Sequence, residues 1–146
     1  MILANEMKRR ELPPLARFRG RDFVTDQVYS REDPIELIHL AVVLKELHRE
    51  MHVTPYLPGR RLGMIFDDPS TRTRVSFETG ATELGGYAVY LRPREMHLPG
   101  RESVADTGRV LSRFLHAIMA RTQTVAVLRE LADAATVPVT NGDAGD

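Results

Sequence analysis

The sequence predicts an α/β fold, a three-layer α/β/α domain around a mostly parallel sheet of about four strands. Short apolar runs alternate with longer segments whose apolar residues recur every three to four positions, the pattern of strands alternating with amphipathic helices. Gly and Pro interrupt the chain at several of the boundaries between them. The chain has 146 residues and no Cys, so its length allows one adequate hydrophobic core and no disulfide supports it.

Residues 1–20 are expected to form an N-terminal arm, because they combine a basic cluster with Pro13 and Pro14 and lack an apolar period. A solvated leader is favoured over a nucleic-acid-binding arm, since Glu6 and Glu11 dilute the charge. Apolar residues precede the basic ones, which reverses the order of a signal peptide, so we expect a cytoplasmic protein.

The first half of the chain is expected to hold two helices and a strand. The first helix should follow Ser30, a residue type favoured as N-cap, and carry an apolar stripe as far as Met51. A buried strand should cover residues 60–66. The second helix should start at Pro69–Ser70 and end at Gly85–Gly86.

The second half repeats the alternation. We expect a strand over residues 87–91, a helix capped by Ser103 that extends to Leu115, a strand over 117–120, a helix over 125–135 and a short strand over 137–139. Strands separated by helices in this order predict parallel pairing through right-handed crossovers.

His48 and His52 lie four residues apart on one face of the first helix. A zinc-protease helix needs Glu directly after the first His, and Arg49 stands there instead. The sequence therefore predicts a solvated helix end here and no metal site.

Residues 67–74 (Asp-Asp-Pro-Ser-Thr-Arg-Thr-Arg) link the first strand to the second helix. Open parallel sheets bind ligands at the carboxyl ends of their strands, where this segment is expected to lie. A helix start presents unpaired N–H groups and a partial positive charge, and Ser70, Thr71 and Thr73 add hydroxyl groups. The segment therefore predicts a phosphate or carboxylate site.

Arg72 and Arg74 place two cations in the first turn of this helix, which opposes the helix dipole unless a bound anion compensates. Arg121 follows the strand at 117–120 and should emerge at the same sheet edge. The chain has neither a G-x-x-x-x-G-K-[ST] nor a G-x-G-x-x-G motif, so a nucleotide site is not favoured. A plain capping segment stays open as the alternative, with these arginines paired to acidic neighbours, namely Asp67, Asp68 and Glu78.

Residues 66–78 (Phe-Asp-Asp-Pro-Ser-Thr-Arg-Thr-Arg-Val-Ser-Phe-Glu), with Leu-Gly-Gly at 84–86, closely resemble the signature of the aspartate/ornithine carbamoyltransferase family. The resemblance covers roughly residues 21–142 and extends through further matching segments at 102–113, 118–122 and 137–142. Within the family the chain resembles the ornithine and putrescine branch more than the aspartate branch, and the Asp-Asp-Pro lead-in and the loop at 96–100 are similar to putrescine carbamoyltransferases.

The resemblance implies a carbamoyl-phosphate-binding domain over residues 21–142. The family's donor contacts transfer to the matching residues of this chain, Ser70, Thr71, Arg72, Thr73 and Arg121. Among these the resemblance makes Arg72, Thr73 and Arg121 catalytic, whereas it makes Arg74 structural.

The resemblance also implies a reaction and partners. The carbamoyl group would pass from carbamoyl phosphate to ornithine or putrescine with release of phosphate, and no cofactor is needed because the donor is already activated. A homotrimer is implied, in which a neighbouring subunit's loop at 97–101, with His97, reaches the site. Zero formal charge and short apolar runs lead us to expect neither nucleic acid nor membrane as a partner.

The family continues past residue 142 with a His-Pro-x-Gln segment and a second, amine-binding domain. Residues 143–146 match neither and are expected to be a truncated linker; an isolated domain, a partial sequence and a natural truncation stay open. The alternative function is a non-catalytic anion-binding or assembly module. Gly108 stands where the family usually has Ala, at a cost of up to about 1 kcal/mol of helix stability.

Overall fold

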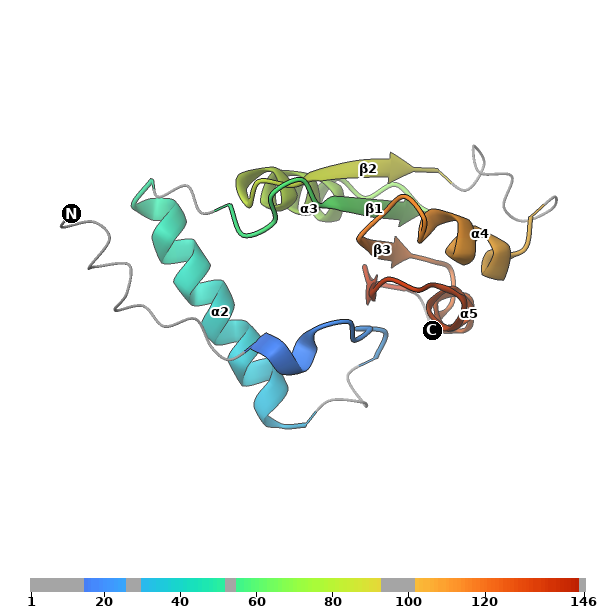
Figure 1. Cartoon of the computed structure of the whole chain (residues 1–146), viewed down its shortest axis with the longest axis horizontal. Helices are drawn as coiled ribbons and strands as arrows, with labels where there is room; N and C mark the ends of the chain where they lie inside the picture. Colours follow the sequence, from blue (N-terminus) through green and yellow to red (C-terminus); the bar gives the residue numbers. More distant parts are fainter. Residues whose placement is uncertain (1–14, 26–29, 52–54, 93–101, 145–146) are drawn as a thin grey trace. The chain divides into compact units, whose positions relative to one another are not determined.

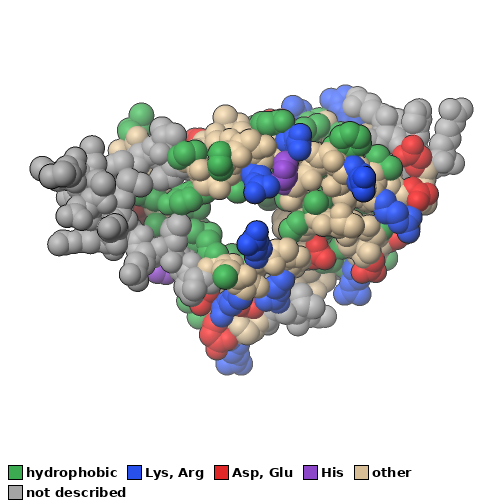
Figure 2. All heavy atoms as spheres, viewed as in Figure 1, with side chains coloured by type: hydrophobic (Ala, Val, Ile, Leu, Met, Phe, Trp, Pro, Cys, Tyr) green, Lys and Arg blue, Asp and Glu red, His purple; other side chains and the backbone are tan. Residues whose placement is uncertain are grey.

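A computed structural model describes residues 15–25, 30–51, 55–92 and 102–144. Its contacts divide the chain into two compact units, residues 1–19 with 26–53 and residues 20–25 with 54–146. No helix within the described ranges combines the length and apolar character that a membrane crossing requires. Both basic and acidic side chains are exposed on the face shown in Figure 2.

The first unit holds a 3₁₀-helix, η1 (Leu15–Phe18), and an α-helix, α2 (Glu32–Arg49). An Arg17 Nη2 group lies 2.8 Å from an Asp33 carboxylate oxygen and 3.0 Å from one of Glu36. These ion pairs fasten the last residues of the predicted arm to the first turns of α2.

The predicted N-cap of α2 is wrong by one residue, because the cap position is taken by Arg31. The side chain that closes the turn is that of Asp33, which accepts a hydrogen bond of 2.9 Å from the backbone N–H of Ser30. The apolar stripe predicted for this helix is also too long. Met51 lies beyond the helix end, where it is exposed and takes a φ of 57°.

The second unit is a parallel α/β layer structure, as predicted (Figure 1). Its described residues form a four-stranded sheet in the order β2-β1-β3-β4, in which all neighbours pair in parallel. The strands are β1 (Arg61–Phe66), β2 (Tyr87–Leu91), β3 (Ala117–Arg121) and β4 (Val139–Asn141). The helices are α3 (Thr71–Glu83), α4 (Val104–Leu111) and α5 (Val125–Ala134).

Two apolar clusters lie on opposite faces of the sheet, because successive side chains of a strand point to opposite sides. On one face Met64, Phe66 and Met119 pack with Phe77 of α3. On the other face a larger cluster combines strand residues with α4 and α5: Ile65, Ile118, Ala120, Val139, Leu128, Leu131, Val104 and Leu111. The predicted three-layer α/β/α arrangement is confirmed.

The predicted end of α4 at Leu115 is wrong, since the helix ends at Leu111. After that residue the bonding is mixed: the N–H groups of Arg113 and Phe114 donate three residues back, at 3.0 Å each, whereas Leu115 N–H donates to Leu111 O at 2.9 Å. Ser112 fixes this turn, because its hydroxyl donates to Gly108 O and its oxygen accepts from Thr136 N–H.

The last strand also starts later than predicted, at Val139 instead of residue 137. Pro138 has no N–H to donate, and its carbonyl accepts from Ile118 N–H at 2.9 Å, which sets the first rung of the ladder. Pairing then continues through Asn141, which lies opposite Ala120.

Gly108 lies where α4 meets α5. A Cβ atom at this position would lie 3.0 Å from the carbonyl oxygen of Leu131 and 3.4 Å from the amide nitrogen of Ala135. Both are backbone atoms and cannot rotate away, so glycine allows this close approach of the two helices.

Candidate functional site

The carboxyl ends of β1 and β3 lie side by side, with Phe66 opposite Arg121 in the register. Just after the last paired residues, Asp67 forms two hydrogen bonds that connect the end of β1 to the end of β3. Its N–H donates to Arg121 O at 3.0 Å, and its Oδ2 accepts from Gln123 N–H at 2.9 Å. These two bonds fix where the loop before α3 and the side chain of Arg121 leave the sheet.

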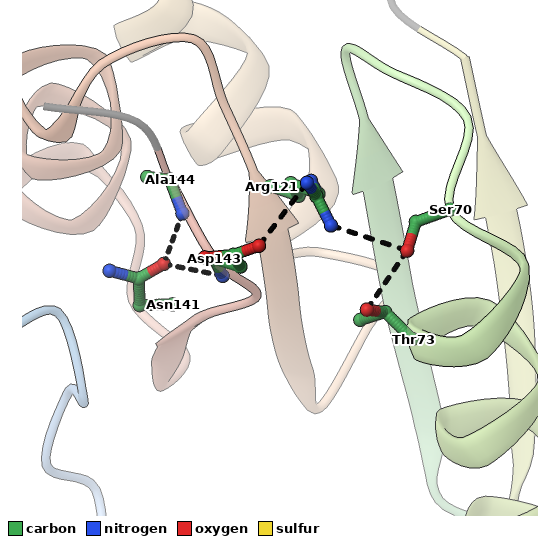
Figure 3. Close-up of polar contacts among 6 residues, drawn as sticks. All are labelled: Ser70, Thr73, Arg121, Asn141, Asp143 and Ala144. Carbon is green, nitrogen blue, oxygen red and sulfur yellow. Dashed lines mark hydrogen bonds and ion pairs between the residues drawn. The ribbon is translucent and has the colours of Figure 1, made fainter.

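Arg121 meets the start of α3 at this edge (Figure 3). Its Nη1 donates to Ser70 Oγ at 3.2 Å, and the Ser70 hydroxyl donates to Thr73 Oγ1 at 3.0 Å. The structure thus brings together side chains separated by about 50 residues, as the strand-end rule predicted.

The amino end of α3 is left open toward this cluster. Ser70 is its N-cap residue in extended conformation, yet the Ser70 side chain makes no capping hydrogen bond and no acidic residue lies in the first turn. The first amide groups of a helix have no carbonyl partner within it, so they remain able to receive an anion.

Thr71 and Arg72 are exposed in the first turn of α3. No hydrogen bond or ion pair joins the side chain of Arg72 to a residue in the described ranges. The structure therefore brings Ser70, Thr73 and Arg121 together, while Arg72 remains an unpaired cation on the helix start next to them.

Arg74 points to the other side, toward β2. Its Nε donates to Glu78 Oε1 at 3.2 Å, and its guanidinium carbon lies 4.0 Å from the centroid of the Tyr90 ring. The contact with Glu78 is the one predicted for this arginine. The capping alternative fails at Asp67, which binds the backbone of Gln123 instead of an arginine.

Asp143 is a member of the cluster that the sequence did not predict. Its Oδ2 lies 3.2 Å from Nη2 of Arg121, so the guanidinium is held from two sides. The residue follows β4 closely, and the strand-end rule that indicated Ser70 and Arg121 applies to β4 as well. Its φ of 86° lies in the left-handed region, where Asp and Asn are the commonest residues after Gly.

Several predictions fall on residues outside the described ranges: most of the N-terminal arm (1–14), His52, His97 with its loop at 97–101, and the last linker residues, 145–146. Within the described ranges no group of three or more His, Asp or Glu side chains is arranged to hold a metal ion.

The fold and the cluster define a parallel α/β domain whose sheet edge carries guanidinium, hydroxyl and helix-start groups suited to an anion. Residues 21–146 match the family described as aspartate/ornithine carbamoyltransferase, carbamoyl-P binding domain. The chain belongs to this family.

Relatives and solved structures agree with this assignment. An ornithine carbamoyltransferase from Halalkalibacterium halodurans is 47% identical over 123 residues, which are 84% of this chain and 39% of that protein. The structure of ornithine carbamoyltransferase from Pyrococcus furiosus superimposes with a TM-score of 0.83 at 43% identity, over 86% of this chain and 40% of that one.

Aspartate transcarbamoylase from Trypanosoma cruzi, solved in complex with carbamoyl phosphate and aspartate, gives a TM-score of 0.84 at 30% identity, over 92% of this chain and 42% of that one. The chain thus spans about two fifths of the length of the relatives it matches.

Proposed function

We propose that this chain is the donor-binding part of a carbamoyltransferase and that the cluster at the sheet edge holds carbamoyl phosphate. One observation carries the proposal: the hydrogen bonds that join Arg121 at the end of β3 to Ser70 and Thr73 at the start of α3. Family membership and the solved relative with bound carbamoyl phosphate support it.

In this proposal the phosphate group of the donor lies on the amino end of α3. The unpaired amides and the hydroxyl groups of Ser70 and Thr71 donate hydrogen bonds to its oxygens. Arg72 and Arg121 supply guanidinium groups, whose planar donors match phosphate oxygens in pairs. A dianion is thereby met by two cations and a helix dipole.

The chemistry follows from this arrangement. A neutral amine attacks the carbonyl carbon of the donor, the C–O bond to phosphate breaks, and the proton lost by the amine nitrogen passes to the leaving phosphate. Thr73 donates to the carbonyl oxygen as negative charge develops there, while Arg72 and Arg121 stabilise the charge that grows on the leaving phosphate. Removal of one such donor typically costs about 2.7–4 kcal/mol of transition-state stabilisation.

We propose ornithine as the acceptor amine, since the relatives are named ornithine carbamoyltransferase. Putrescine, which the sequence left open, is the competing outcome. The test is a transfer assay with a protein that carries this chain together with an amine-binding domain, in which the two amines are compared at equal concentration with carbamoyl phosphate held constant. Faster transfer to putrescine would overturn this choice and leave the donor site untouched.

The homotrimer and the reach of His97 into a neighbouring site are proposed from the family resemblance alone. Sedimentation equilibrium of the full chain tests the first, with three chain masses as the expected result. A monomer at all concentrations would refute it.

Calorimetric titration with carbamoyl phosphate tests the donor site. We expect binding by the full chain and its loss in Arg72→Ala, because Arg72 contributes an unpaired cation to the helix start. Arg129→Ala is the matched control, since Arg129 is exposed on α5 and its loss changes the net charge equally. No binding heat at millimolar donor, with the chain shown to be folded by circular dichroism, would refute the donor site.

A further inference from the structure

We propose that Asp143 is an internal competitor for the donor. In the structure its carboxylate holds Arg121, and the phosphate group of carbamoyl phosphate has either to displace that carboxylate or to bind beside its negative charge. The inference rests on the proposed function, because it takes Arg121 as a ligand of the donor.

The guanidinium of Arg121 is engaged at both terminal nitrogens. Nη1 donates to Ser70 Oγ at 3.2 Å, and Nη2 lies 3.2 Å from Oδ2 of Asp143 (Figure 3). The Ser70 hydroxyl is in turn directed to Thr73. The side chains proposed to receive the donor are therefore bound to one another, and an incoming phosphate has to replace part of this network.

The side chain of Asn141 holds the turn that carries Asp143. Asn141 Oδ1 accepts from the N–H groups of Asp143 at 2.8 Å and of Ala144 at 2.7 Å. Asn141 is itself anchored, because its Nδ2 donates to Val24 O at 3.0 Å. This side-chain-closed turn holds Asp143 at a φ of 86°, in a region that Asp enters more readily than most residues.

The exposure of the two partners makes the ion pair displaceable. The side chain of Asp143 is 76% exposed, whereas that of Arg121 is 31% exposed. An ion pair this open to water is weak, and a carboxylate released from it is readily solvated. A phosphate dianion brings more charge than the carboxylate and also gains the amides of α3, so it can replace the carboxylate.

The negative charge of Asp143 determines the direction in which donor affinity should change when that charge is removed. If the carboxylate leaves, donor binding has to break an ion pair; if it stays, it repels the phosphate bound beside it. Removal of its charge should therefore raise donor affinity in either case. An Asp143 that instead positioned Arg121 for the donor would give the opposite sign, since its loss would release the guanidinium.

The decisive variant is Asp143→Asn in the full chain, which removes the charge and retains a residue type tolerated at positive φ. By calorimetry at low ionic strength we expect it to bind carbamoyl phosphate roughly two- to fivefold more tightly than the wild-type chain. The same ratio is expected with inorganic phosphate, because the competition concerns the phosphate group. The ratio should fall as salt is added.

Asp133→Asn is the matched control, since it removes one exposed carboxylate near the far end of α5. Unchanged or weaker binding by Asp143→Asn, with wild-type binding intact, would overturn the competitor and leave the donor site standing. An equal gain in carbamoyl phosphate affinity in Asp133→Asn would mean that only the net charge matters, and it would also overturn the competitor role of Asp143. No binding by any of the chains would overturn both this inference and the proposed function.

Discussion

The two hydrogen bonds of Asp67 connect the ends of β1 and β3, and replacing Asp67 by Ala tests whether this connection positions Arg121. The carboxylate accepts from Gln123 N–H at 2.9 Å, on the segment that follows Arg121 in the chain. The backbone bond from the N–H of residue 67 to Arg121 O survives in the variant, since it needs no side chain. The substitution therefore removes one half of the connection.

The loss of stability can be derived from this single bond. Hydrogen bonds to charged groups contribute about 1.5–3 kcal/mol when sheltered, but Asp67 is half-buried and water can reach the released amide of Gln123. We expect a loss of about 1–1.5 kcal/mol in the free energy of unfolding, which lowers Tm by roughly 3–6 °C in a domain of this size. Asp67→Asn keeps an acceptor oxygen and should lose less.

Urea unfolding followed by circular dichroism measures the stability, and calorimetry with carbamoyl phosphate measures the site. Because the segment carrying Arg121 is less constrained in Asp67→Ala, donor affinity should fall by roughly threefold to tenfold, as when a hydrogen bond of about 1 kcal/mol is weakened. Asp68→Ala is the neighbouring control, since Asp68 is exposed and bonds to no described residue. Equal urea midpoints for the two variants would refute the reasoning.

Three further predictions concern the rest of the domain. Gly108→Ala should have a free energy of unfolding about 1–3 kcal/mol lower than Gly80→Ala, and therefore a lower urea midpoint. Both variants gain helix propensity, but only Gly108→Ala adds a Cβ atom 3.0 Å from Leu131 O, whereas Gly80 has open space around it. Equal urea midpoints would contradict this. His116 accepts a backbone N–H at Nδ1, and its partial burial, with two neighbouring arginines, lowers its pKa below the ordinary 6.5. The folded chain then binds fewer protons than the unfolded one, so stability should fall as pH drops from 6.5 through the lowered pKa, and His116→Asn should flatten this slope in urea titrations at stepped pH. Arg74→Met should lower stability by about 1 kcal/mol and leave carbamoyl phosphate affinity within about twofold in calorimetry, since this arginine binds Glu78 and Tyr90 and not the donor cluster.

Topology explains why most of the cluster was predictable. The carboxyl ends of parallel strands lie at one edge of the sheet. Recognising the strands that end before Ser70 and at Arg121 was therefore enough to predict that these two residues lie close together. The pairing of Arg74 with Glu78 was equally accessible, because residues four apart on a helix are neighbours.

Asp143 was not predictable in the same way. Its position depends on where β4 ends, and the apolar run at 137–139 gave no sign that pairing continues to Asn141. It depends also on the turn closed by Asn141, which sets a positive φ that local sequence does not require. The prediction of where α4 ends was wrong for a related reason. The Ser112 contacts that shape this end involve Thr136, which is distant in sequence.

The three arginines of the predicted anion site differ in what already neutralises them. Arg74 is paired with Glu78, Arg121 is paired with Asp143, and Arg72 is paired with no described residue. With a formal charge of zero, the chain has no net charge to attract an anion. On the proposed function, the first attraction of the donor therefore falls to Arg72 and the amino end of α3. On the same proposal and the competition inferred for Asp143, Arg121 would bind the phosphate against its carboxylate partner, so donor affinity would depend on both arginines and be lowered by Asp143.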